Sequence, residues 1–166
     1  MLPDERLDKL CGALRAIPHI DFLRIGTKVP AMLPMRVAPG LVRVLKKWRP
    51  LWLSVHFSHP MELTERAEEA CRRLADAGIP LMNQCVLLKG VNDGDGVLEA
   101  LFERLLRVGV KPYYLHWADR VAGTSHFRAS KTRGRELLRA MNGRTTGYAV
   151  PRFMEDPVGG GKKRPI

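Results

Sequence analysis

Short β-like runs that alternate with amphipathic helical stretches constrain this chain more than any other feature of its sequence. The β-like runs are rich in apolar and β-branched residues and cover residues 22–27, 51–57, 81–88 and 110–117. Apolar residues at helical spacing precede the first run and follow each of the four, over residues 7–14, 41–48, 67–74, 97–106 and 137–141. Strands that alternate with helices of this length are joined by right-handed crossovers into a parallel sheet. The sequence therefore predicts an α/β fold with about four βα units, as half of a TIM-like barrel or as a small doubly wound sheet.

Residues that cap or stop helices stand at the ends of several helical stretches. Thr64 is placed to cap the helix over residues 67–74, and Gly78 suits the position just after its end. Gly109 and Gly143 stand after the next two helical stretches in the same way. These signals support the helix boundaries independently of the apolar spacing.

The length and composition are those of one globular domain. The chain has 166 residues, with 45% apolar and 27% charged residues, which is ordinary globular usage. It has no apolar stretch long enough to span a membrane, and its first residues lack the pattern of a signal peptide. We therefore expect a soluble, cytoplasmic protein with no membrane partner.

The charge balance is strongly basic, with a formal net charge of +11 at pH 7. Residues 128–166 contribute ten basic and three acidic side chains, or +7, to this total. Such a segment attracts anions. Nucleic acid, a phosphorylated cofactor and simple solvation of a basic face are all compatible with it, so a non-catalytic nucleic-acid-binding module is kept as an alternative function.

The three cysteines do not form a recognisable metal or disulfide pattern. Cys11, Cys71 and Cys85 are 60 and 14 positions apart, which fits neither an even disulfide framework nor a C-x2-C metal motif. We expect reduced, structural cysteines and no metal site.

The last segment contains the chain's main candidate for covalent chemistry. We expect residues 1–150 to form the barrel portion and residues 151–166 to form a glycine- and lysine-rich loop, in which three glycines precede Lys162 and Lys163. The pattern is not a Walker phosphate loop. A lysine amine beside flexible backbone can bond an aldehyde such as pyridoxal phosphate; a flexible basic tail is the alternative interpretation.

Polar side chains stand at or beyond the predicted strand ends, where functional residues of parallel sheets gather. Asp119 follows the fourth strand and Asp156 precedes the glycines, so the two carboxylates could bind an ammonium group together. Either could instead be a cap or a surface charge. His56 and His59 lack a third ligand for a metal, and Gln84 needs a partner inside its strand, either backbone or a ligand.

Five segments together resemble the lysine 2,3-aminomutase family of radical S-adenosylmethionine enzymes, in order and with compatible spacing. They are LRIGTKVP (residues 23–30), HFSHP (56–60), NQCVLLKGVND (83–93), PYYLH (112–116) and GYAVP (147–151). The resemblance implies a partial (β/α) barrel in which this chain supplies about four units of a six-unit half-barrel. It also implies conversion of L-lysine to β-lysine by a radical amino migration that uses pyridoxal phosphate, S-adenosylmethionine and a [4Fe-4S] cluster.

The resemblance also assigns roles to residues of this chain. Alignment from GYAVP without a gap makes Lys163 the lysine that holds pyridoxal phosphate, with Lys162 as the adjacent alternative. Asp119 and Asp156 correspond to the residues that hold the side-chain ammonium of the substrate, which favours lysine over glutamate. His56 and Gln84 correspond to positions near S-adenosylmethionine.

Some family features are absent from this sequence. The cluster motif C-x3-C-x2-C does not occur in it, so we interpret the chain as the C-terminal part of such an enzyme and expect it to be inactive alone. A separate N-terminal polypeptide or a homo-oligomer could complete it. His116 with residues 119–123 resembles the branch that makes β-lysine for modification of elongation factor P, which is the alternative within the family.

Overall fold

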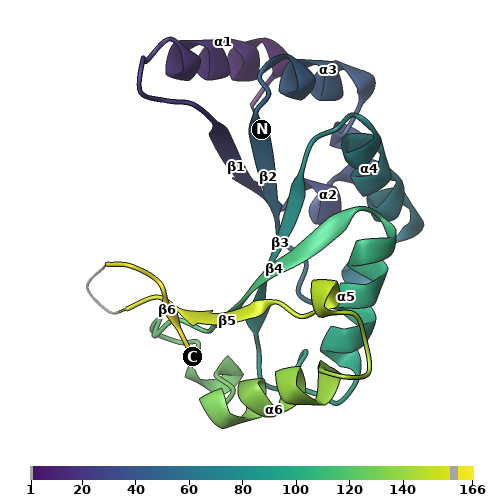
Figure 1. Cartoon of the computed structure of the whole chain (residues 1–166), viewed down its shortest axis with the longest axis vertical. Coiled ribbons are helices and arrows are strands. Elements are labelled where there is room, and N and C mark those ends of the chain that lie inside the picture. Colours follow the sequence, from purple (N-terminus) through teal and green to yellow (C-terminus); the bar gives the residue numbers. More distant parts are fainter. Residues whose placement is uncertain (1, 158–160) are drawn as a thin grey trace.

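The chain folds into one curved sheet with helices along its outer side (Figure 1). The computed structural model describes residues 2–157 and 161–166. The first five strands are parallel and the sixth is antiparallel to the fifth. In sheet order, which is also chain order, the strands are β1 (Leu23–Thr27), β2 (Leu51–Val55), β3 (Leu81–Leu87), β4 (Val110–Trp117), β5 (Arg152–Glu155) and β6 (Arg164–Pro165).

The helices connect the parallel strands as the apolar spacing predicts. They are α1 (Asp4–Arg15), α2 (Val29–Met32), α3 (Pro39–Lys47), α4 (Glu65–Asp76), α5 (Val97–Arg107) and α6 (Lys131–Met141). The Thr64 hydroxyl accepts a hydrogen bond from the Ala67 amide at 3.2 Å, which confirms the predicted cap of α4. Gly78, Gly109 and Gly143 all have positive φ just after helices, the conformation that glycine adopts without steric cost.

The two faces of the sheet differ in burial and polarity. Along β3, alternate residues such as Leu81, Cys85 and Leu87 are buried under the helices, and the residues between them are half-buried on the opposite face. Register places Gln84 beside Tyr114 of β4 and Val86 beside His116. The face that the helices leave free therefore carries polar side chains toward the carboxyl ends of the strands.

The predicted fold class and the four predicted strands are confirmed, and the structure adds two strands for which the sequence shows no periodic pattern. Residues 151–166 were expected to form a loop, whereas they contain β5 and β6. β5 has only four residues, and its two buried side chains, Phe153 and Met154, are adjacent and not alternate, so no strand period appears in the sequence. Pairing with β4 on one side and β6 on the other determines its conformation. Gly159 and Gly160 of the glycine run lie outside the described residues.

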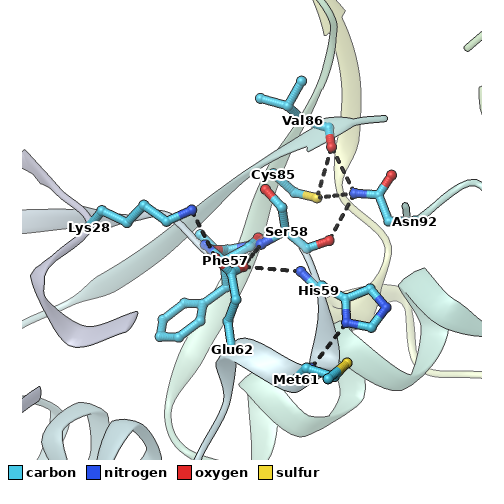
Figure 2. A network of polar contacts seen from close by, with 10 residues as sticks. Lys28, Phe57, Ser58, His59, Met61, Glu62, Cys85, Val86 and Asn92 are labelled. Atoms are coloured by element: carbon cyan, nitrogen blue, oxygen red, sulfur yellow. Dashed lines mark hydrogen bonds and ion pairs between the residues drawn. The ribbon is translucent and has the colours of Figure 1, made fainter. Parts of the chain in front are cut away.

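Asn92 holds the turn after β3 in place. Its buried side-chain amide donates to the carbonyls of Ser58 and Val86, both at 2.8 Å (Figure 2). Its side-chain oxygen accepts a hydrogen bond from the Leu88 amide at 2.7 Å. One side chain thus ties the carboxyl end of β3 to the loop after β2. Both segments lie at the edge of the sheet where functional residues were expected.

We predict that Asn92→Ala destabilises the fold by about 2–3 kcal/mol, because it leaves several backbone groups without their partner. The measurement is urea unfolding followed by circular dichroism. Asn142→Ala is the control, since Asn142 is exposed and its loss should change stability by less than about 0.5 kcal/mol. Equal stabilities of the two variants would contradict this role for Asn92.

Gly134 in α6 allows β5 to approach the helix. A Cβ at this position would lie 2.4 Å from Cζ of Phe153 and 3.0 Å from a methyl of Leu87. The absence of a side chain at Gly134 is therefore what lets the Phe153 ring pack between α6 and the sheet. This contact fixes the strand that leads to Asp156.

Gly134→Ala should destabilise the protein by about 1–2 kcal/mol, because displacement of a packed ring costs more than the roughly 1 kcal/mol that alanine gains in a helix. Thermal unfolding measures the change. Gly147→Ala is the control variant, since no atom lies within 4 Å of a Cβ built at Gly147. A stabilised Gly134→Ala variant would show that the close approach is not required.

Candidate functional site

A cavity of about 330 Å³ lies toward the carboxyl ends of β3 and β4, and Asp156 after β5 and Lys163 before β6 also line it. Its lining includes five polar or charged side chains from distant parts of the sequence: Gln84, His116, Asp119, Asp156 and Lys163. Four of them, Gln84, Asp119, Asp156 and Lys163, are site residues predicted from the sequence. For His116 the sequence indicated only a resemblance to one branch of the family. The structure therefore brings together residues that the sequence could place only near strand ends.

The pairing of β5 with β6 places Lys163 opposite Asp156. The antiparallel register sets Met154 against Pro165 and Glu155 against Arg164, so the next pair along is Asp156 with Lys163. Side chains directly opposite in such a pair lie close enough to interact. The Lys163 Nζ is indeed 3.5 Å from Oδ2 of Asp156. Lys162, one position earlier, does not line this cavity.

His116 completes a cluster of three side chains around the Lys163 amine. Its Nε2 lies 3.3 Å from Lys163 Nζ, and its Nδ1 lies 3.8 Å from Oδ2 of Asp156. The Lys163 Nζ also sits 5.4 Å from the centre of the Tyr114 ring, within the range of a cation–π contact. The amine is thus held by a carboxylate, an imidazole and an aromatic face.

The environment keeps the His116 imidazole neutral at pH 7. Burial lowers the pKa of His116, the positive charge of Lys163 lowers it further, and the nearby carboxylates of Asp156 and Asp119 only partly oppose these effects. Only 12% of the His116 side chain is exposed. A neutral imidazole can accept a hydrogen bond from the Lys163 ammonium, which agrees with the short distance between their nitrogens.

Asp119 lies two residues beyond β4 and lines the cavity. Its backbone carbonyl accepts hydrogen bonds from the Val121 amide at 3.0 Å and from the Arg128 guanidinium at 3.3 Å. Among the described residues, its carboxylate has no hydrogen bond or ion pair. Asp119 and Asp156 also line a second cavity, of about 850 Å³, adjoining the first. The two carboxylates therefore stand where the two cavities meet.

His56, at the end of β2, lies beside this cavity and does not line it. Burial lowers the pKa of His56, and the positive charges of Lys28 and Lys163 lower it further. His56 in turn lowers the pKa of His116. The structure thus places His56 within electrostatic reach of the cluster.

The loop that follows His56 is fixed by Glu62, which the sequence analysis did not single out. Glu62 accepts hydrogen bonds from the backbone amides of Ser58 and His59, and its other oxygen pairs with Lys28 at 2.8 Å (Figure 2). Burial opposes its ionisation, but these partners outweigh burial and lower the pKa of Glu62. A capping-box spacing, with Glu62 three residues after His59, was the signal in the sequence.

His59 and the cysteines have structural positions. His59 Nδ1 accepts a hydrogen bond from the Met61 amide at 3.2 Å. Cys11, Cys71 and Cys85 are buried in α1, α4 and β3, and burial raises the thiol pKa of Cys71 and of Cys85 to about 12. Over the described ranges, no three potential metal-ligating side chains come together. The cysteines of this chain therefore do not fit a [4Fe-4S] cluster.

Comparison with solved structures identifies the class of fold. A radical SAM methyltransferase from Sphaerobacter thermophilus aligns with a TM-score of 0.62 and 18% identity, over 80% of this chain and 40% of that one. Streptococcus suis SuiB bound to S-adenosylmethionine aligns with a TM-score of 0.62 and 13% identity, over 93% and 37%. The fold is that of a radical S-adenosylmethionine barrel.

Comparison with curated sequences is more specific. The chain is 46% identical over all 166 residues to L-lysine 2,3-aminomutase of Clostridium subterminale and 40% identical over 165 residues to glutamate 2,3-aminomutase of Clostridioides difficile. It spans 40% and 39% of the lengths of these relatives. No protein-family model matches it. The resemblance to the lysine 2,3-aminomutase family is confirmed over the length of this chain.

Within residues 2–157 and 161–166, no helix is both long and apolar enough to cross a bilayer.

The site predicts a pH dependence of stability. The pKa of His116 is lowered from the ordinary value of 6.5, so the unfolded chain takes up a proton at a higher pH than the folded chain does. This contribution to stability is complete above pH 6.5 and is lost as the pH falls through the lowered pKa. His116→Gln should therefore lose less stability between pH 7.5 and about 5.5 than the parent chain, as measured by urea unfolding. The pKa of His56 is also lowered, so His56 should account for part of the pH dependence of stability that remains in His116→Gln. Identical slopes in both proteins would contradict the burial of a neutral His116.

Proposed function

We propose that this chain supplies the pyridoxal phosphate lysine and the substrate-ammonium site of an enzyme that interconverts L-lysine and β-lysine by radical amino migration. The observation that carries the proposal is the single cavity shared by the Lys163 amine and the carboxylates of Asp119 and Asp156. The sequence identity to L-lysine 2,3-aminomutases supports it.

The residues around Lys163 fit an aldehyde cofactor. The amine projects into the cavity, beside an imidazole that accepts hydrogen bonds. Pyridoxal phosphate, when bound, supplies an aldehyde for the lysine and a conjugated ring that stabilises an unpaired electron next to it. Within this chain, Lys163 would hold the cofactor, and His116 would orient the Lys163 amine and accept its proton.

The two carboxylates favour a substrate whose side chain ends in an ammonium group. The carboxylates of Asp119 and Asp156 accept hydrogen bonds and would repel the side-chain carboxylate of a substrate such as glutamate. An ammonium group offers three donors and the opposite charge. This chemistry supports L-lysine over L-glutamate as the substrate, although the chain is similar to aminomutases of both names.

His56 and Gln84 would contact S-adenosylmethionine. His56 directly follows β2, and Gln84 lies within the neighbouring strand β3, one residue after Asn83, which pairs with Val55. Gln84 lines the cavity with a side chain that is only half-buried. A neutral imidazole and an amide can bind the hydroxyl and amino groups of a nucleoside. The fold comparison with a protein that binds S-adenosylmethionine supports this assignment. No step is assigned to an iron–sulfur cluster, because the cysteines of this chain do not fit one.

The attachment of pyridoxal phosphate can be tested directly on the purified chain. Borohydride treatment after incubation with pyridoxal phosphate should leave a pyridoxyl adduct on Lys163, identified by peptide mass spectrometry. Lys162→Ala should retain the adduct and Lys163→Ala should lose it, because only Lys163 projects toward the cavity. An adduct spread evenly over surface lysines, or one that follows Lys162, would refute the assignment.

A further inference from the structure

Lys163 is not a free amine in this structure. Its nitrogen is 3.5 Å from Asp156 and 3.3 Å from His116. Asp156 is also one of the two carboxylates proposed to hold the ammonium group of the substrate. One carboxylate therefore lies within reach of two amines that the reaction requires, and it cannot fully serve both at once.

We propose that Asp156 serves two amines in turn: it holds the ammonium group of Lys163 until the cofactor is attached and then receives the side-chain ammonium of the substrate. This inference rests on the proposed function. It adds that the cofactor lysine occupies part of the substrate site before the cofactor arrives. Loading of the cofactor thereby prepares the site for its substrate.

The chemistry of attachment requires Lys163 to leave Asp156. Only the neutral amine attacks an aldehyde, whereas a neighbouring carboxylate stabilises the charged ammonium form. Attachment exchanges the aldehyde oxygen for the Lys163 nitrogen and releases one water, and the extra ammonium proton passes to the neutral His116 or to solvent. Withdrawal of Lys163 toward the aldehyde then leaves Asp156 without its amine partner.

Asp119 provides a contrast within the same cavity. It lines the same space as Asp156, but its carboxylate makes no ion pair with any residue in the described part of the chain. The position of Asp156 is explained by the strand register, which sets it across from Lys163, whereas Asp119 follows β4. The two carboxylates should therefore differ in their effect on Lys163 while both contribute to binding of the substrate.

Competitive acetylation without cofactor tests the first half of the proposal. The chain is treated with a trace of acetic anhydride at pH 8, and the labelling of Lys163 relative to its neighbour Lys162 is measured by mass spectrometry. Asp156→Asn should raise this ratio about two- to fivefold, the range expected for a partly exposed ion pair. Asp119→Asn should leave it unchanged. An unchanged ratio in Asp156→Asn, or an equal rise in Asp119→Asn, overturns the proposal.

The rate of cofactor attachment separates failure of this inference from failure of the proposed function. Samples are taken at intervals after addition of pyridoxal phosphate and quenched with borohydride. Asp156→Asn should form the Lys163 adduct about two- to fivefold faster than the parent chain. An adduct that forms at the same rate or more slowly in this variant overturns the double use of Asp156. Absence of a Lys163 adduct in every variant instead overturns the proposed function, and this inference with it.

The second half is tested on the chain loaded with pyridoxal phosphate and freed of excess cofactor, without borohydride, because reduction would leave Lys163 as a cationic secondary amine. Binding of L-lysine is compared with that of L-norleucine, which has the same carbon chain without the side-chain ammonium group, by equilibrium dialysis. The loaded parent chain should prefer L-lysine, and both Asp156→Asn and Asp119→Asn should reduce this preference. No preference in the parent chain, or a preference that survives in Asp156→Asn, overturns the transfer of Asp156 to the substrate.

Discussion

The candidate site depends on the antiparallel pairing between β5 and β6. All the other strands are parallel, and parallel strands bring only their carboxyl ends to the site. The reversed strand returns the chain to this edge and sets Lys163 across from Asp156. This return needs β5 to pack closely on α6, which Gly134 permits by leaving room for Phe153. The absence of a side chain at Gly134 thus helps to place the Lys163 amine.

Electrostatics then determine what the site can do. Burial and the charge of Lys163 keep His116 neutral, so the imidazole accepts a hydrogen bond and does not repel the ammonium group. Asp156 supplies the balancing negative charge, and Asp119 adds a second one at the boundary with the larger cavity. This arrangement of charges supports the proposal that the site binds amines. Both the proposed cofactor lysine and the proposed substrate side chain present this group.

Much of this arrangement could be predicted from the sequence, and the reasons for the gaps are physical. Alternation of apolar runs and helical spacing predicted the four buried strands, because residues facing the core must be apolar. The same reasoning missed β5 and β6, which are short and owe their conformation to their neighbours. Position in the sequence indicated Asp119 and Asp156 as a possible ammonium site and the lysines after the glycines as possible aldehyde-binding residues, and the resemblance favoured Lys163 over Lys162. The contacts among these residues depend on how strands far apart in the sequence pair with one another, and no local sequence pattern contains that information. For the same reason the sequence did not predict the contact between His116 and Lys163.

The central claim is that Lys163 and Asp156 face each other in solution. A zero-length carbodiimide cross-link, mapped by mass spectrometry, tests it most directly, because the reagent joins an amine and a carboxylate only when they touch. The account predicts a Lys163–Asp156 cross-link alongside one between Lys28 and Glu62, whose ion pair at 2.8 Å serves as the internal standard. Formation of the Lys28–Glu62 link without any link from Lys163 to Asp156 would contradict it.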